Sequence, residues 1–257
     1  MGQAIFKPLY SFLTVLGGMG RFMADIFKAM VTPPIYIAEM RRALHTITFQ
    51  CLVPVLAIMT AVGMIGSLQG LAVIRIFGAD HVLSSLLAES ILREMAPTLS
   101  AIMIAAQAGT AIAGEIGTMR VKEELDALGV MAVRPLKFVV VPRLIAMVVA
   151  CPLISLFGSL AGMVGGYVVA VGLKGVTKGV FLGNLLEFVH MNVIFGGLFK
   201  SCVFGALIGL IACYYGYNVS GGAQGVGKAA NKTVVHAIVA IAICNYFITT
   251  WLLKVLG

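Results

Sequence analysis

Charged residues are scarce in this sequence. Asp, Glu, Lys and Arg make up 11% of the 257 residues, and only ten side chains are acidic. No polar segment is long enough to form a second domain outside a membrane. Hydrophobic residues make up 60% of the chain, well above the roughly 45–50% of soluble domains. The composition therefore predicts an integral membrane protein with one membrane domain.

The sequence also lacks the spacings that metal sites and disulfide frameworks require. The five cysteines lie in or beside apolar runs without a CxxC pair, which indicates buried small side chains. The four histidines are scattered along the chain without metal-ligand spacing. We expect no catalytic residue, no metal ligand and no cofactor in this chain.

One segment has the outline of a nucleotide site. Residues 222–228 fit the GxxxxGK spacing, but Ala229 follows where a phosphate-binding loop needs Ser or Thr to reach Mg²⁺. An apolar run precedes the segment in place of a strand. We interpret the segment as a flexible cytoplasmic turn, and any ATP and Mg²⁺ should bind to a partner.

Five apolar runs are each long enough to cross a bilayer, since a helical span needs about 20 apolar residues. They cover residues 52–74, 89–114, 144–173, 193–215 and 233–255. We predict an all-α membrane protein with interfacial and elbow helices over residues 1–48 and a five-span domain over 49–257. A signal peptide is the alternative at the amino end, but residues 17–20 lead into Arg21 without a cleavage site.

Lys and Arg predict how the spans are oriented, because short cytoplasmic loops are enriched in them. They concentrate in the amino segment, in residues 115–143 and in the loop before the last span. These parts should face the cytoplasm, and a chain with five spans has its two ends on opposite sides. The carboxyl end is therefore expected on the far side.

The segment 115–129 is a charged interruption between two spans and holds four of the ten acidic residues. Val121, Leu125 and Leu128 recur at helical spacing, while charges occupy the rest of the surface. We predict a short amphipathic coupling helix at about 115–130, whose apolar positions dock into a groove of a partner.

Ionisable residues inside or beside the spans are the other candidates, since such groups are costly in hydrocarbon unless they pair or reach water. Glu89, Arg93 and Glu94 begin the second span, and Lys200 lies in the fourth. Two interpretations remain open: an interfacial ion-pair cluster, or the rim of a cavity for lipid headgroups or an outer partner.

Small residues at regular spacing predict close helix packing. They are Gly109, Gly158, Gly162, Gly166, Gly205 and Gly209.

Several motifs in order resemble the MlaE/YrbE family of ABC transporter permeases, which move phospholipid or other lipids between membranes. They are LREMAP at 92–97, AGTAIAGEIGTM at 108–119, VKEELDAL at 121–128, Lys200-Ser201, GGAQGVG at 221–227 and TVV at 233–235. The resemblance covers most of the chain from about residue 35. One departure is Gln107, where many members have Arg.

The resemblance implies a homodimer in the bacterial inner membrane, bound to two cytoplasmic ABC ATPase subunits, a periplasmic MCE-domain ring and often a STAS-domain protein. Lipid would bind between protomers, against spans one, two and five; nucleic acid is not an expected partner. The ATPase-coupling candidates are Glu115, Met119, Arg120, Val121, Glu123, Glu124, Leu125, Asp126 and Leu128.

Three hypotheses follow. The first is the non-catalytic permease subunit of an ABC phospholipid transporter. The second is an ion-coupled lipid carrier that uses Glu89, Arg93 and Glu94 as a relay, which an ion gradient rather than ATP would drive. The third is an intramembrane lipid-modifying enzyme, and the absence of a paired acid, base and nucleophile within the spans argues against it.

Overall fold

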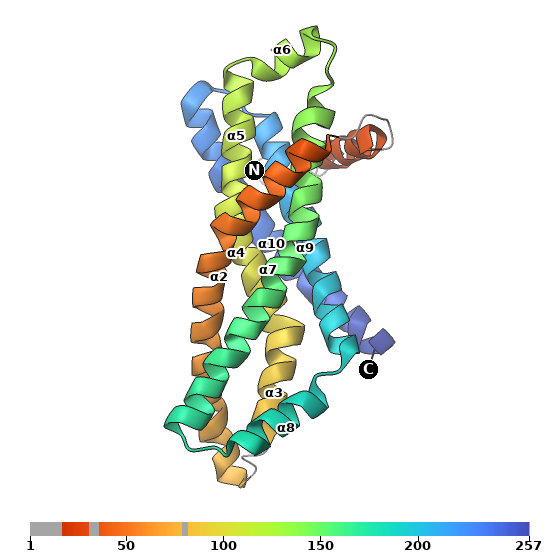
Figure 1. Ribbon diagram of the computed structural model, residues 1–257. Helices are drawn as coiled ribbons and strands as arrows, with labels where there is room; N and C mark the ends of the chain where they lie inside the picture. Colours follow the sequence, from red (N-terminus) through yellow and green to blue (C-terminus); the bar gives the residue numbers. More distant parts are fainter. Residues whose placement is uncertain (1–16, 31–35, 79–81, 257) are drawn as a thin grey trace, which may run out of the picture.

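The computed structural model describes residues 17–30, 36–78 and 82–256, and all regular elements in these ranges are helices (Figure 1). Five helical segments of the described chain are long and apolar enough to cross a membrane, which confirms the expected all-α architecture. They are Ile37–Ile74, Leu83–Val121, Leu136–Leu173, Met191–Tyr217 and Gly222–Lys254.

The first span is one continuous helix, α2 (Ile37–Ile74), which merges the expected elbow helix with the first span. No glycine or proline interrupts residues 37–53, so nothing in the local sequence ends the helix at the membrane surface. Before it, residues 17–30 are helical, and Phe22 packs against Tyr214 and Tyr217 with ring centroids 5.7 Å apart in each pair. The predicted interfacial helix therefore packs against the carboxyl end of the fourth span. The part of it before residue 17 lies outside the described residues.

The second and third spans are helices broken by π-helical turns. The second consists of α3 (Leu83–Ser90), η3 (Ile91–Met95), α4 (Ala96–Ile104), η4 (Ala105–Gly109) and α5 (Thr110–Val121). The third consists of η5 (Leu136–Val140), α7 (Val141–Tyr167) and η6 (Val168–Leu173). Such turns reset which side chains face a neighbouring helix and are frequent at functional sites.

The core forms where α7 packs between α2 and α9 (Met191–Tyr217), and glycines bring these helices close together. A Cβ at Gly63 of α2 would collide with the backbone carbonyl of Gly162, and one at Gly205 would meet the carbonyl of Met147. The remaining glycines expected at packing faces also lie against side chains of neighbouring helices: Gly109, Gly158, Gly166 and Gly209.

The glycine-rich segment before the last span is helical and not the flexible turn that we expected. Helix α10 (Gly222–Leu256) begins inside the segment, and Gly221 and the first helical residue, Gly222, have φ values of 87° and 66°. Gly225 has no room for a Cβ because the Ser220 carbonyl lies against it, so a tight turn leads directly into the helix. A helix over residues 222–228 has no loop to wrap a phosphate.

Short helices close the two ends of the bundle. Helix α6 (Glu124–Val130) joins the second and third spans at one end, and α8 (Lys178–Phe188) joins the third and fourth at the other (Figure 1). We call the α6 end the inner end, since the Lys and Arg pattern predicts that it faces the cytoplasm, and the α8 end the outer end.

Candidate functional site

The strongest polar feature within the spans is an ion pair between Glu94 of η3 and Lys200 of α9. The Lys200 Nζ lies 2.9 Å from each carboxylate oxygen of Glu94. The Lys200 side chain is fully buried, whereas the Glu94 side chain is 38% exposed. The pair lies well below the outer end of the bundle, roughly 16 Å along the second span from Leu83 at 1.5 Å per residue.

A proline frees one of the acceptors that Lys200 uses. Pro97 lacks a backbone N–H and its ring crowds the carbonyl of the residue four positions earlier, which is Arg93. The Lys200 ammonium donates to this carbonyl over 3.2 Å. The lysine therefore satisfies two acceptors of the second span, one from a side chain and one from the backbone.

Helix α10 completes the cluster with residues that the sequence did not single out. Asn245 Nδ2 and Thr249 Oγ1 donate to the Glu94 carboxylate over 3.2 and 3.0 Å, and Thr98 donates to the Asn245 side chain over 3.2 Å. Asn245 and Thr249 are four residues apart in an apolar run, so their shared helix face was the available signal. We call Glu94, Thr98, Lys200, Asn245 and Thr249 the midspan network.

The four predicted rim residues divide into two pairs. Arg93 and Glu89 form a separate i,i+4 ion pair at 2.7 Å on the exposed side of the helix. Glu94 and Lys200 bond to each other, and the Thr249 contact to Glu94 adds a third span. Gln107 lies on the π-helical turn η4, deeper along the same span, and is exposed.

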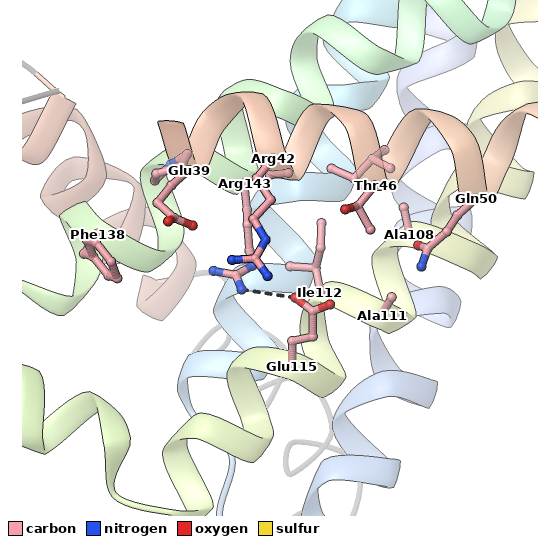
Figure 2. Close-up of a pocket in the computed structure, with 13 residues that line it drawn as sticks. Glu39, Arg42, Thr46, Gln50, Ala108, Ala111, Ile112, Glu115, Phe138 and Arg143 are labelled. Carbon is pink, nitrogen blue, oxygen red and sulfur yellow. Dashed lines mark hydrogen bonds and ion pairs between the residues drawn. The ribbon is translucent and has the colours of Figure 1, made fainter. Parts of the chain in front are cut away.

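A second polar region lies at the inner end, where α2, α5 and the start of the third span enclose a cavity of about 370 Å³ (Figure 2). Arg143 Nη2 lies 3.1 Å from Glu115 Oε2, and Arg143 Nη1 donates to the Val139 carbonyl over 3.0 Å. We call this space the inner cavity. Its polar lining residues are Glu39, Arg42, Thr46, Gln50, Glu115 and Arg143.

The coupling segment differs from the single amphipathic helix that we expected. Helix α5 ends at Val121, Glu123 adopts a left-handed conformation with φ of 60°, and α6 starts at Glu124. Arg120 pairs with Asp126 across this break at 2.7 Å and lies over the Tyr217 ring at 6.0 Å. The break folds the segment back on itself.

Leu125, which we expected to dock into a partner, is buried within the chain. Its side chain is only 1% exposed because it packs into the core of the chain, and Met119 and Leu128 are partly buried against the same core. Among the apolar positions expected to dock, Val121 is exposed. Val130, the last residue of α6, and Met131, just after it, are more exposed still, at 90% and 72%.

Other predicted coupling residues remain on the surface. Glu123 and Glu124 are exposed, and Lys122 lies 4.0 Å from Glu124. Glu115 instead lines the inner cavity. Within residues 17–30, 36–78 and 82–256, no group of three His, Cys, Asp or Glu side chains could hold a metal ion.

Comparisons with known proteins agree with one another. Residues 40–251 match the family model described as permease MlaE. A probable ABC transporter permease of Rickettsia typhi is 34% identical, and the match covers 97% of this chain and 96% of the relative. A probable ABC transporter permease of Synechocystis is 39% identical, and the match covers 77% of this chain and 76% of the relative. The intermembrane phospholipid transport system permease protein MlaE of Haemophilus influenzae is 33% identical, and the match covers 96% of this chain and 95% of the relative.

Proposed function

The chain belongs to the MlaE permease family, and we propose that it is the transmembrane subunit of an ABC transporter that moves phospholipid between the inner membrane and a periplasmic MCE-domain partner. The near full-length similarity to the Haemophilus phospholipid permease carries this proposal. ATP hydrolysis takes place in a separate cytoplasmic subunit, which binds the ATP and Mg²⁺. The chain itself binds lipid without altering it.

The coupling segment is the proposed contact with that ATPase. Val121, Val130 and Met131 expose apolar area at the inner end, next to the exposed carboxylates of Glu123 and Glu124. A groove on the partner would bury the apolar group while the charges set the register. Movement of this segment reaches the second and third spans directly, because α6 lies between them.

The proposed lipid pocket lies between two copies of the chain. Helix α10 is one of its walls, because it exposes the apolar residues Val239, Ile243 and Phe247 and also supplies two donors to the midspan network. The half-exposed Glu94 would present charge to a lipid headgroup or to the MCE-domain partner. The amino end faces the cytoplasm and the carboxyl end the periplasm, and a STAS-domain protein completes the assembly.

The decisive experiment separates ATP from an ion gradient as the energy source. The purified transporter, with its ATPase, is reconstituted into vesicles that contain fluorescent phospholipid, and transfer to the MCE-domain partner is followed. We expect transfer to stop when ATP is withheld and to survive dissipation of proton and sodium gradients. Transfer that continues without ATP but stops with the gradient would contradict the proposal and favour the ion-coupled carrier.

A variant pair locates the coupling contact in the same preparation. Val130→Asp with Met131→Asp places two charges in the proposed groove contact, so the ATPase should no longer co-purify. Ile76→Asp should have no such effect, because Ile76 is an apolar residue, 78% exposed, in the short turn Arg75–Phe77 that follows α2 at the outer end. Retention of the ATPase by the double variant would show that the partner docks elsewhere.

A further inference from the structure

Several polar side chains that line the inner cavity, among them Glu39 and Arg42, belong to neither the midspan network nor the coupling segment. Its volume of about 370 Å³ falls within the roughly 300–1,000 Å³ of small-molecule sites. Figure 2 shows Arg42 and Arg143 pointing into the same space, from helices that are far apart in the sequence. The cavity therefore has the size and convergent side chains of a binding site.

Among the residues that the structure describes, one charge of each sign at this cavity has no partner. Glu115 and Arg143 neutralise each other at 3.1 Å. Glu39 and Arg42 form no hydrogen bond or ion pair with any residue that the structure describes, although both line the cavity. A ligand that carries both a negative and a positive group would pair both residues without adding net charge.

The order of polar groups along α2 matches the order of groups in a phospholipid. From the inner end, the cavity face presents Glu39, Arg42, Thr46 and Gln50. At 1.5 Å per residue, Glu39 and Arg42 are about 4.5 Å apart along the helix, and Thr46 lies about 6 Å beyond Arg42. An ammonium joined to a phosphate by two carbons, followed by the ester groups on glycerol, presents the matching sequence: cation, anion, then hydrogen-bond acceptors.

The rest of the lining is apolar, which distinguishes a lipid from a free phosphate compound. Ile47, Ile112 and Phe138 face the cavity beside the polar stripe, and Ala108 and Ala111 leave room between the helices. These surfaces suit the glycerol backbone and the first carbons of the acyl chains. A soluble phosphate ester would leave them in contact with water.

We infer that the inner cavity binds a zwitterionic phospholipid of the cytoplasmic leaflet that has a primary ammonium group, with its phosphate on Arg42 and its ammonium on Glu39. The lipid's ester carbonyls accept hydrogen bonds from Thr46 and Gln50. This inference rests on the proposed function, because it names a class of cargo and a loading site on the side of the membrane opposite the MCE-domain partner.

Binding is measured on the full-length protein, stripped of lipid in detergent, by native mass spectrometry. The probes are dioleoyl phosphatidylethanolamine, dioleoyl phosphatidylglycerol and free phosphoethanolamine. Arg42→Gln should weaken phosphatidylethanolamine binding about tenfold or more, because it removes a charge-assisted hydrogen bond. Arg41→Gln is the matched control: Arg41 is exposed and adjacent on the same helix but does not line the cavity.

Two further variants test the ammonium contact and the space. Glu39→Gln should bring the affinities for phosphatidylethanolamine and phosphatidylglycerol together, since only the first has an ammonium group. Ala111→Phe fills the cavity and should remove one bound lipid per chain. Thermal unfolding of each variant confirms that the chain remains folded.

Equal lipid retention by Arg42→Gln and Arg41→Gln would overturn the inference. So would free phosphoethanolamine that competes as well as the lipid, which would identify a soluble phosphate site. If the transport assay succeeds while these binding results fail, only the loading site is wrong. If binding depends on Arg42 but no lipid is transferred, the transport proposal is wrong and the site remains.

Discussion

The midspan network offers the sharpest test of the energetics, because its two ions differ in exposure. Lys200 is fully buried, whereas the Glu94 side chain is 38% exposed and keeps donors from Asn245 and Thr249. Replacing Glu94 by Ala leaves an ammonium in the core with only the Arg93 carbonyl as acceptor. Replacing Lys200 by Met leaves a carboxylate that still has hydrogen-bond donors and solvent.

The expected losses of stability follow from this asymmetry. Glu94→Ala should cost about 3–5 kcal/mol, the usual penalty for breaking a buried ion pair. Lys200→Met should cost about 1–3 kcal/mol, as for a buried polar group that loses one partner. The double variant should be more stable than the sum of the two losses predicts, because neither ion is then left alone.

The free energy of unfolding can be measured by titrating the purified protein with a denaturing detergent and following tryptophan fluorescence. The chain has one tryptophan, and its ring, on α10 at Trp251, lies 6.0 Å from that of Phe199 on α9. The signal therefore reports on the two helices that the network joins. Arg93→Gln is the control, since its exposed pair with Glu89 should contribute only about 0–1 kcal/mol.

Two results would refute this reasoning. One is a loss below about 0.5 kcal/mol for both single variants, which is the range of ordinary surface substitutions. The other is strict additivity in the double variant, which would show that Glu94 and Lys200 do not interact energetically.

Further predictions concern packing and the coupling segment. Gly63→Ala should destabilise the chain by about 1–3 kcal/mol or more, because the new Cβ would meet the Gly162 backbone, which cannot move aside. Thermal unfolding measures this loss. Gly114→Ala should show no such loss, because its Cβ would meet nothing within 4 Å. Leu125→Ala should cost about 2–5 kcal/mol of stability, seen in the same assay, and normal stability would mean that Leu125 is not a core residue. Glu123→Gly should raise the melting temperature, because it relieves a left-handed conformation that costs about 1–2 kcal/mol, and an unchanged or lower value would contradict that strain.

The sequence anticipated the spans because hydrophobicity is a property of contiguous residues. Five apolar runs gave five membrane-length helices, although each helix in the structure extends beyond its apolar run. The errors came where local composition and local structure disagree. Glycines within 222–228 suggested a flexible turn, yet α10 starts at Gly222, because the long apolar run that follows continues the helix despite the weak propensity of glycine.

The coupling segment shows a second limit. Helical spacing placed Val121, Leu125 and Leu128 on one face, and this inference holds only for an unbroken helix. The left-handed Glu123 breaks it, so Val121 remains exposed while Leu125 turns into the core. A non-glycine residue in this conformation has no reliable signal in a single sequence.

The sequence alone determined that this protein resides in a membrane, that it has five helices of membrane-spanning length and that it resembles the MlaE permeases. These conclusions rest on the apolar runs and on ordered local motifs. Only the tertiary structure decided which charges act together. Glu94 and Lys200 are 106 residues apart in the chain, and Glu115 and Arg143, which pair beside the inner cavity, are 28 residues apart. Such pairs form because helices packed through glycine contacts bring distant residues within hydrogen-bond range, and no local pattern encodes that distance.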